Sequence, residues 1–549
     1  MNTPLAQPDA IPAKRQILAE VLLVFAVFFV QGADPVPSVN EPYYLGKAIH
    51  YWNSDWGQGD FFLEQSTDAT HLIFYFTFGW LACWMPPTVL AWTGRVLTWA
   101  LLAWAWRRLS FAVVPRRWYA ILTAALFAGL LQWCHFAGEW VIGGVEAKGF
   151  AYVLVLLGIE AIVRDRWNRA WLLFGAASAF HVLVGGWSVV AAGVAWIATG
   201  RHRPPLKTMG PALLGGFLLS LLGLLPALLL NLQTTADVGR AHEIYVFDRL
   251  AHHLAPWLLP EYFWPRIAWF GAAAAAWLAL SWAPAVDQTM RRLRAFVAGA
   301  FAIAAVGAAI GPLVYHQSTV AAGLLRFYWF RLSDVAVPLG VSLALVSLIV
   351  RLRSTRPTLG RCMLLVAIAA AGTHLGLLAS RPLCRPPAAH RSIDPAYQLA
   401  DFLDWQDVCR QVARSKTISQ GSRFLTPRAS QTFKWYSSRS EVVNWKEIPQ
   451  DAETIVEWSE RLKRIHGSVD FRLPVEVARW RLWERQWRAP IWEGGPAQLP
   501  DGRDMAQVAQ WLRTIGEEYD AKYVLTVARP RLPLPEVCGN RSYVVYSLE

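Results

Sequence analysis

Two short acidic stretches hold the residues of this chain that are best suited to chemistry. The first, NEPYYLGKA, places Glu41 beside one asparagine and two tyrosines, which are Asn40, Tyr43 and Tyr44. The second, CHFAGEWVIGGVEAKG, carries two glutamates and a lysine, which are Glu139, Glu146 and Lys148. A carboxylate can take a proton from an attacking hydroxyl or hold a divalent cation. The two stretches therefore indicate acid–base or metal-assisted chemistry.

A third stretch supplies positive charge. The segment YHQSTVAAGLLRFYWFRLSD contains Arg326 and Arg331 among aromatic residues. The guanidinium group is suited to binding phosphate oxygens with two parallel hydrogen bonds. Acidic groups combined with these cations predict a site for an anionic ligand that is partly buried in lipid.

The composition shows what kind of protein must position these residues. The chain has 549 residues, of which 55% are hydrophobic and 17% charged. Its apolar residues fall in blocks close to the roughly 20 residues that a transmembrane helix needs. The 30 tryptophans suit the interfacial belts of such a protein. The net charge of +13 does not indicate nucleic-acid binding, because the excess arginine lies in short loops between apolar blocks.

The basic loops give an orientation to the apolar blocks. Basic connectors near residues 106–117, 163–169, 201–207, 290–294 and 351–361 are each separated by two blocks, as expected if all of them lie in the cytoplasm. The first apolar run follows Lys14 and Arg15, and we interpret it as an uncleaved helix rather than a signal peptide. This pattern works only if the short block at 71–86, which ends in Pro86 and Pro87, does not cross. We expect that block to lie in the membrane plane or to re-enter on the outer face.

The sequence therefore predicts a mainly α-helical, polytopic membrane domain over residues 1–384. It has about eleven crossings, and the chemically interesting loops share its outer face. The crossings are expected near residues 13–33, 88–106, 118–135, 148–163, 169–182, 186–199, 209–230, 265–283, 295–313, 331–350 and 362–380.

Residues 385–549 differ in character and predict a small soluble α/β domain outside the cytoplasm. Alternating apolar runs typical of strands occur in SRFLTP, SEVVNW, KYVLTV and RSYVVYSL. Helical patterns separate them, in AYQLADFLDWQDVCRQVA and DMAQVAQWLRTIGEEY. A disulfide between Cys409 and Cys538 is one option outside the cell. The six cysteines show no metal-binding spacing.

This arrangement resembles the GT-C superfamily of membrane glycosyltransferases. That group includes the protein O-mannosyltransferases, the aminoarabinose transferases and the catalytic subunit of oligosaccharyltransferase. NEPYY stands where such enzymes often show Asp-Glu followed by Tyr, and GGVEAKGFAYVLVLLGIEA stands where they show a second acidic residue opening a helix. The string FLTPRASQTFKWYSSRSEVVNWKEIPQD also resembles uncharacterised bacterial multi-pass membrane proteins, a likeness that covers most of the chain.

The resemblance implies transfer of a sugar from a polyprenyl-phosphate donor on the outer face of the bacterial inner membrane. Glu41 and Glu146 would be the catalytic residues, with Glu41 as the base or metal ligand. The remaining candidates would bind substrate: Asn40, Tyr43, Tyr44, Lys148, Arg326 and Arg331. The partners implied are a lipid-linked sugar and membrane lipids, with no nucleic acid. The acceptor is not specified, and a divalent cation is left open because no metal ligand set is assigned.

Other interpretations of the same residues stay open. Asn40 occupies the usual aspartate position, which favours a non-catalytic scaffold that binds glycan or a protein partner. Glu41 alternatively caps a helix, Arg326 and Arg331 alternatively anchor a helix end at the headgroups, and His181 is interpreted as a packing residue. A transporter is a weaker alternative, because the charges gather at one face and no repeat is visible.

Overall fold

The protein is mainly helical and has several helices with the character of membrane spans. The computed structural model describes residues 13–64, 70–230, 237–282, 287–390, 398–466 and 505–549. Five helical segments in these ranges are long and apolar enough to cross a membrane, namely Lys14–Gly32, Leu206–Leu229, Gln288–Tyr315, Arg331–Thr355 and Pro357–Ala379. The chain is therefore a multi-pass integral membrane protein.

A long helix lies close to each predicted crossing. These helices are α1 (Lys14–Gly32), α4 (Pro87–Val113), α5 (Tyr119–Trp133), α6 (Ala147–Val163), α7 (Trp167–Phe180), α8 (Val182–Ala198), α9 (Leu206–Leu229), α12 (Pro260–Trp282), α13 (Gln288–Ile310), α15 (Arg331–Thr355) and α16 (Pro357–Ala379). Length and composition qualify only part of this set as spans, so the number of eleven crossings stays a prediction.

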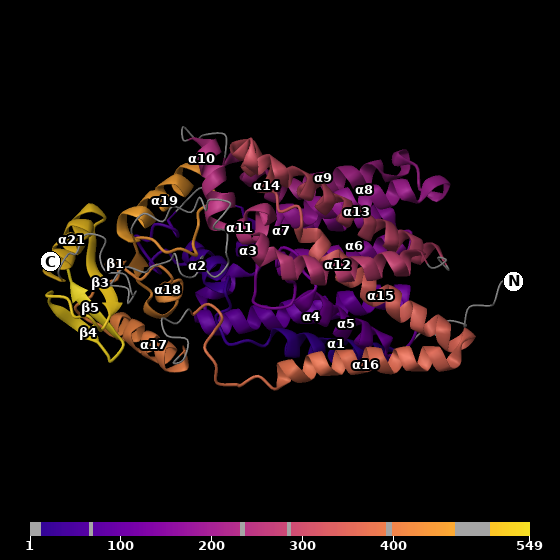
Figure 1. Cartoon of the computed structure of the whole chain (residues 1–549), viewed down its shortest axis with the longest axis horizontal. Helices are drawn as coiled ribbons and strands as arrows, with labels where there is room; N and C mark the ends of the chain where they lie inside the picture. The colour runs from indigo at the N-terminus through magenta and orange to yellow at the C-terminus, as the bar shows by residue number, and fades with distance from the viewer. Residues whose placement is uncertain (1–12, 65–69, 231–236, 283–286, 391–397, 467–504) are drawn as a thin grey trace.

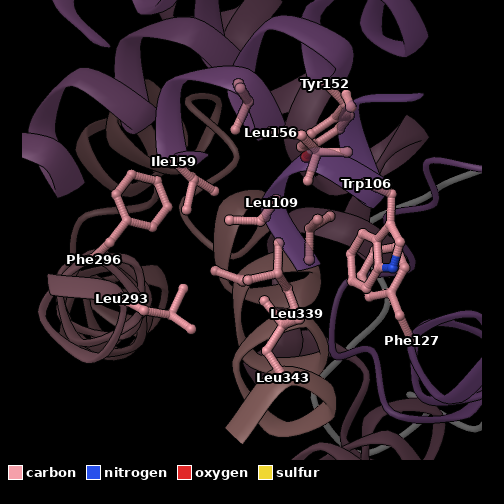
Figure 2. Close-up of a cluster of buried hydrophobic side chains, with 14 of the residues drawn as sticks. Trp106, Leu109, Phe127, Tyr152, Leu156, Ile159, Leu293, Phe296, Leu339 and Leu343 are labelled. Atoms are coloured by element: carbon pink, nitrogen blue, oxygen red, sulfur yellow. The ribbon is translucent and has the colours of Figure 1, made fainter. Parts of the chain in front are cut away.

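The helical bundle packs around a continuous apolar core. Side chains from α4, α5, α6, α13 and α15 meet there, as Figure 2 shows for Trp106, Phe127, Ile159, Phe296 and Leu339. Small residues allow close helix approach elsewhere in the bundle. A Cβ added at Gly175 of α7 would lie 2.1 Å from the carbonyl oxygen of Gly216 of α9. Such contacts are typical of helix packing in membranes, where van der Waals fit replaces the hydrophobic drive.

The block at 71–86 contains only short helices. Helix α3 (Leu72–Thr77) is followed by the 3₁₀ turn η1 (Gly79–Cys83), and α4 begins at Pro87. Six residues of α-helix rise about 9 Å, well short of the ~30 Å apolar layer. The lack of a crossing helix over 71–86 agrees with the prediction for this segment.

Short elements lie between the bundle and the C-terminal sheet (Figure 1). They include α2 (Glu41–Trp52), α10 (Val238–Glu243), the π-helical turn η3 (Ile244–Arg249), α11 (Ala251–Leu254) and α14 (Ser318–Leu325). Besides η1, the described residues of the membrane part contain three further 3₁₀ turns, namely η2 (Gly200–His202), η4 (Pro256–Leu258) and η5 (Gly311–Tyr315).

The C-terminal part is built on a small mixed sheet of order β2-β1-β3-β5-β4. Its strands are β1 (Arg423–Leu425), β2 (Ser440–Glu441), β3 (Ala521–Val527), β4 (Glu536–Gly539) and β5 (Tyr543–Ser547). Strand β1 pairs in parallel with β2 and β3, whereas β5 pairs antiparallel with β3 and β4. The helices of this part are α17 (Gln398–Arg414), α18 (Phe433–Ser437), α19 (Ala452–His466) and α21 (Met505–Glu518).

The predicted α/β character of this region is confirmed. The division of the chain at residue 385 stays a prediction. Each predicted alternating run contains a strand, but β4 was not predicted. Its sequence EVCG shows no alternation, and the strand lies at the edge of the sheet with no fully buried side chain. The disulfide considered between Cys409 and Cys538 is not formed, because both residues are free thiols.

One buried ion pair joins the first acidic stretch to the bundle. The Glu41 carboxylate receives two hydrogen bonds of 2.7 Å from the Arg95 guanidinium on α4, and neither side chain is exposed. The backbone N–H groups of Ser38 and Val145 also donate to this carboxylate, at 2.7 Å and 2.9 Å. Glu41 thus links the start of α2, the middle of α4 and the loop before α6.

We expect Arg95→Met to destabilise the fold strongly. Removing one partner of a buried pair leaves an uncompensated charge, which costs about 3–5 kcal/mol. The midpoint of thermal unfolding of the purified, detergent-solubilised protein should fall. Arg414→Met, at an exposed position at the end of α17, should leave it unchanged. Equal midpoints for Arg95→Met and wild type would contradict this account.

Candidate active site

A cavity of about 410 Å³ lies between the bundle and the C-terminal part. Its lining includes residues of α2, α6, α8, α9, α10, η3, α11 and α15, of the loops before α6 and α15, and residues 446–455 of the C-terminal part. Among the predicted site residues, seven line it: Asn40, Tyr43, Tyr44, Glu146, Lys148, Arg326 and Arg331. The structure therefore brings together residues that are up to 291 positions apart, from Asn40 to Arg331.

Glu41 is the exception, because it does not line this cavity. Its carboxylate is enclosed by Arg95 and by two backbone N–H groups. This geometry suits a positioning role, in which Glu41 holds its neighbour Asn40 at the cavity wall.

The loop before α6 is held by a buried aspartate. Asp334 of α15 accepts hydrogen bonds from the backbone N–H groups of Phe136, Ala137 and Glu139, at 2.7, 2.8 and 3.2 Å. Its side chain has no exposed surface. His253 of α11 also contacts the carbonyl oxygen of Ala137, with Nδ1 at 2.5 Å. The loop that carries both glutamates is thus fastened at its start by α15 and α11.

Glu146 presents a carboxylate to the cavity with one oxygen engaged by an amide. Asn40 Nδ2 donates to Oε1 at 2.8 Å, and Lys148 Nζ lies 3.4 Å from Oε2. Within the part of the chain that the structure describes, Oε2 has no hydrogen-bond partner. Burial raises the pKa of Glu146 above that of an exposed glutamate, although Lys148 and Asn40 act in the opposite direction. A carboxylate with a raised pKa is well suited to exchange protons near neutral pH.

Arg331 lies at the centre of a second group of contacts. Its Nε is 3.1 Å from Glu139 Oε2, and its Nη1 donates to His181 Nε2 at 3.0 Å. Its guanidinium also lies 4.0 Å from the centre of the Tyr328 ring. Glu139 in turn lies 3.6 Å from Lys148 Nζ. Glu146, Lys148, Glu139 and Arg331 therefore form one chain of alternating charges.

Aromatic residues and a second arginine extend the lining. The Tyr43 hydroxyl accepts a hydrogen bond of 2.7 Å from Gln450 Nε2. Burial raises the pKa of Tyr44 well above its usual value, so its hydroxyl stays protonated. Arg326 contacts His242, whose pKa is lowered to about 4 by burial and by the arginine. A neutral His242 can accept the hydrogen bond that Arg326 donates.

The cavity carries an excess of positive charge. Five basic side chains line it, against the carboxylates of Glu139 and Glu146. The basic residues are Lys148, Arg249, Arg326, Arg331 and Lys446. With the histidines neutral, the formal excess is three positive charges. Apolar side chains of α9 also reach the lining, namely Leu224, Ala227 and Leu228. This combination suits an anionic ligand with an apolar tail.

No group of three or more His, Cys, Asp or Glu side chains is arranged to hold a metal ion within the described ranges. The charged groups among the described lining residues are mainly the nitrogen atoms of lysine and arginine side chains, which bind anions.

Sequence reasoning did not select several residues that the structure adds to the site. His181, interpreted as a packing residue, accepts a hydrogen bond from Arg331. Glu139 was noted as an acidic residue of the loop but was not selected, and it joins Arg331 to Lys148. Arg249, Lys446 and Gln450 lie in segments that were not connected with the site. Lys446 and Gln450 reach the site only because the C-terminal part docks on the membrane part, where Arg249 lies, and no local pattern reveals that contact.

Comparison with known proteins identifies the fold. A family model described as a domain of unknown function, DUF6798, matches residues 403–465. No protein of curated function matches the chain. Among solved structures, the arabinofuranosyltransferase AftD from Mycobacteria, solved as a mutant by single-particle cryo-EM, is similar with a TM-score of 0.51 at 15% identity.

The match to AftD covers 99% of this chain and 42% of the AftD chain, so the protein spans less than half the length of that relative. The crystal structure of the Archaeoglobus fulgidus oligosaccharyltransferase with Zn and sulfate is similar at a TM-score of 0.41 and 11% identity. That match covers 93% of this chain and 68% of that one. The conclusion about fold rests on the AftD match alone: the chain has a GT-C-like fold and is structurally similar to GT-C membrane glycosyltransferases.

Proposed function

We propose that this protein is a membrane glycosyltransferase that moves a sugar from a polyprenyl-phosphate donor to an acceptor hydroxyl. The observation that carries the proposal is the placement of the Glu146 carboxylate and the Arg331 and Lys148 cations in one cavity. The GT-C-like fold supports it, as does the apolar lining from α9. We place the cavity on the outer face of the bacterial inner membrane, with residues 385–549 outside the cytoplasm and eleven crossings in residues 1–384.

In this proposal Glu146 is the general base. The acceptor oxygen attacks the anomeric carbon of the sugar, and its proton passes to the carboxylate of Glu146, which lines the cavity and whose Oε2 receives no hydrogen bond from the described residues. The bond between the anomeric carbon and the phosphate oxygen breaks, and the lipid phosphate leaves with the bonding electrons. Arg331 and Lys148 stabilise the charge on the leaving phosphate. Asn40 keeps the glutamate oriented through its hydrogen bond to Oε1.

Arg331 is the main donor-binding residue in this scheme. Its guanidinium is fastened by Glu139, His181 and the Tyr328 ring, so little side-chain freedom remains to be lost when phosphate binds. Arg326, Tyr43 and Tyr44, which line the same cavity, complete the donor site. A scaffold that binds the lipid without transferring sugar would keep these contacts and lack turnover.

The first test concerns the base. Glu146→Gln preserves shape and removes the proton acceptor, so the transfer rate should fall by about 10² to 10⁴-fold. Binding of undecaprenyl phosphate should change much less. The substitution Glu453→Gln, at an exposed position of α19, serves as the control. A wild type that binds the lipid but never transfers sugar would favour the scaffold, and full activity in Glu146→Gln would exclude this residue as the base.

The pH dependence of the reaction provides a further check. Because the pKa of Glu146 is raised, the proton acceptor is lost at a higher pH than for an exposed glutamate. The plot of kcat/KM against pH should fall on its acid side through this raised pKa, and Glu146→Gln should abolish that limb. An acid limb that survives unchanged in Glu146→Gln would show that another group titrates.

The last test concerns donor affinity. Arg331→Ala removes a charged hydrogen-bond partner worth about 1.5–3 kcal/mol, or roughly 10- to 150-fold in Kd. Arg331→Lys keeps the charge but loses the two-pronged geometry, and it should give an intermediate Kd. The measurement is binding of undecaprenyl phosphate to protein in nanodiscs. Equal Kd values for wild type and Arg331→Ala would remove Arg331 from the donor site.

A further inference from the structure

We infer that the C-terminal part completes the donor site, with Lys446 as the residue through which it binds the phosphate of the lipid. This inference rests on the proposed function and adds a binding residue to it. We call residues 442–451, which lie between β2 and α19, the roof loop. Lys446, Ile448 and Gln450 of this loop line the cavity together with Glu146 and Arg331.

The roof loop has a defined shape around Lys446. Asn444 Oδ1 accepts hydrogen bonds from the backbone N–H groups of Lys446 and Glu447, at 2.9 and 3.0 Å. This turn places the Lys446 side chain on the cavity side, half-buried. The Trp458 ring nitrogen donates to the Asn444 carbonyl at 3.0 Å and fastens the turn to α19.

Residues of the membrane part also form hydrogen bonds with the roof loop. Arg249 of η3, itself a lining residue, donates to the carbonyl oxygens of Trp445 and Lys446, at 2.9 and 3.3 Å. Gln450 donates to Tyr43 of α2 at 2.7 Å. Both contacts tie the roof loop to elements that also line the cavity, so Lys446 has a defined position relative to Glu146 and Arg331.

A buried charge cluster anchors the other side of the loop. Lys434 Nζ contacts Glu447 and lies 3.1 Å from Asp60 and 2.9 Å from Glu441. All four side chains are at most 2% exposed. Asn444 Nδ2 donates to Glu441 and Glu447 at 2.7 Å each. Asp60 lies between α2 and α3, so the cluster joins that connection to the roof loop.

The positive charge of Lys446 interacts electrostatically with the carboxylate of Glu146. It is among the cations that favour the ionised form of Glu146. The carboxylates of Glu139 and Glu146 already lie close to Arg331 and Lys148. Lys446 belongs to the positive excess of the cavity, which an incoming phosphate would balance. Lys446 and Arg331 line the same cavity from separate parts of the chain, which would let the two cations bind one phosphate together.

The segment matched by the family of unknown function, residues 403–465, contains Lys434, Asn444, Lys446 and Gln450. In this chain, therefore, the matched segment would serve to close the cavity and supply its last cation.

The test uses the full chain in phosphatidylcholine nanodiscs. Binding is measured for undecaprenyl phosphate, for undecaprenol, which lacks the phosphate, and for inorganic phosphate, which lacks the lipid. Lys446→Met should weaken undecaprenyl phosphate binding about tenfold and leave undecaprenol binding unchanged. Lys446→Arg should restore most of the affinity. Lys463→Met, an exposed lysine of α19 in the same part of the chain, is the matched control and should bind like wild type.

The outcomes separate this inference from the proposed function. If wild type binds undecaprenyl phosphate and Lys446→Met binds it equally well, the role of Lys446 is overturned and the proposed function stands. An equal loss for undecaprenol also overturns it, because the effect then comes from the shape of the roof loop. Tighter binding of inorganic phosphate than of the lipid would point to a soluble anion instead. A wild type that binds neither phosphate overturns both.

Discussion

The pairing of Glu41 with Arg95 is the constraint on which the rest of the site depends. A carboxylate and a guanidinium, both fully buried, persist only where each satisfies the other, because an unpaired buried charge is very costly. Arg95 lies within the long helix α4, so the pair fastens the start of α2 to the bundle. The hydrogen bond from Val145 brings in the loop before α6. Asn40 and Glu146, the neighbours of these two contacts, are thereby placed within hydrogen-bond distance of each other.

The requirement that a buried charge be paired distinguishes structural charged residues from those that line the cavity. The Asp334 carboxylate accepts hydrogen bonds from three backbone N–H groups. The Lys434 ammonium forms ion pairs with three acidic side chains. Burial raises the pKa of Glu447 to about 8, and repulsion from Glu441 and Asp60 adds to this effect against the attraction of Lys434. The groups around the cavity differ, because Glu146 and five basic residues line it.

Local patterns predicted most of the fold but only part of the site. Apolar blocks of membrane length predicted the long helices, and alternation predicted β1, β2, β3 and β5, because burial on one face gives a periodic pattern in the sequence. The acidic and basic stretches predicted seven residues that line the cavity. Glu41 was selected for its residue type, and its type could not show that Arg95, 54 positions away, encloses it. Lys446 and Arg249 could not be selected from the sequence. No local sequence pattern indicates that the turn after β2 contacts a segment between membrane helices.

The asparagine at position 40 is understandable once its partner is known. In the family that the sequence resembles, an aspartate usually stands at this position. Here the Asn40 amide donates a hydrogen bond to Glu146, whereas an ionised aspartate could only accept one. A carboxylate at that distance from Glu146 would repel it and raise its pKa further, so that the base would be protonated over more of the pH range. With the first-loop carboxylate of Glu41 committed to Arg95, an amide at position 40 keeps Glu146 oriented and able to ionise. The departure from the family pattern is thus compatible with catalysis in which the second acidic residue is the base.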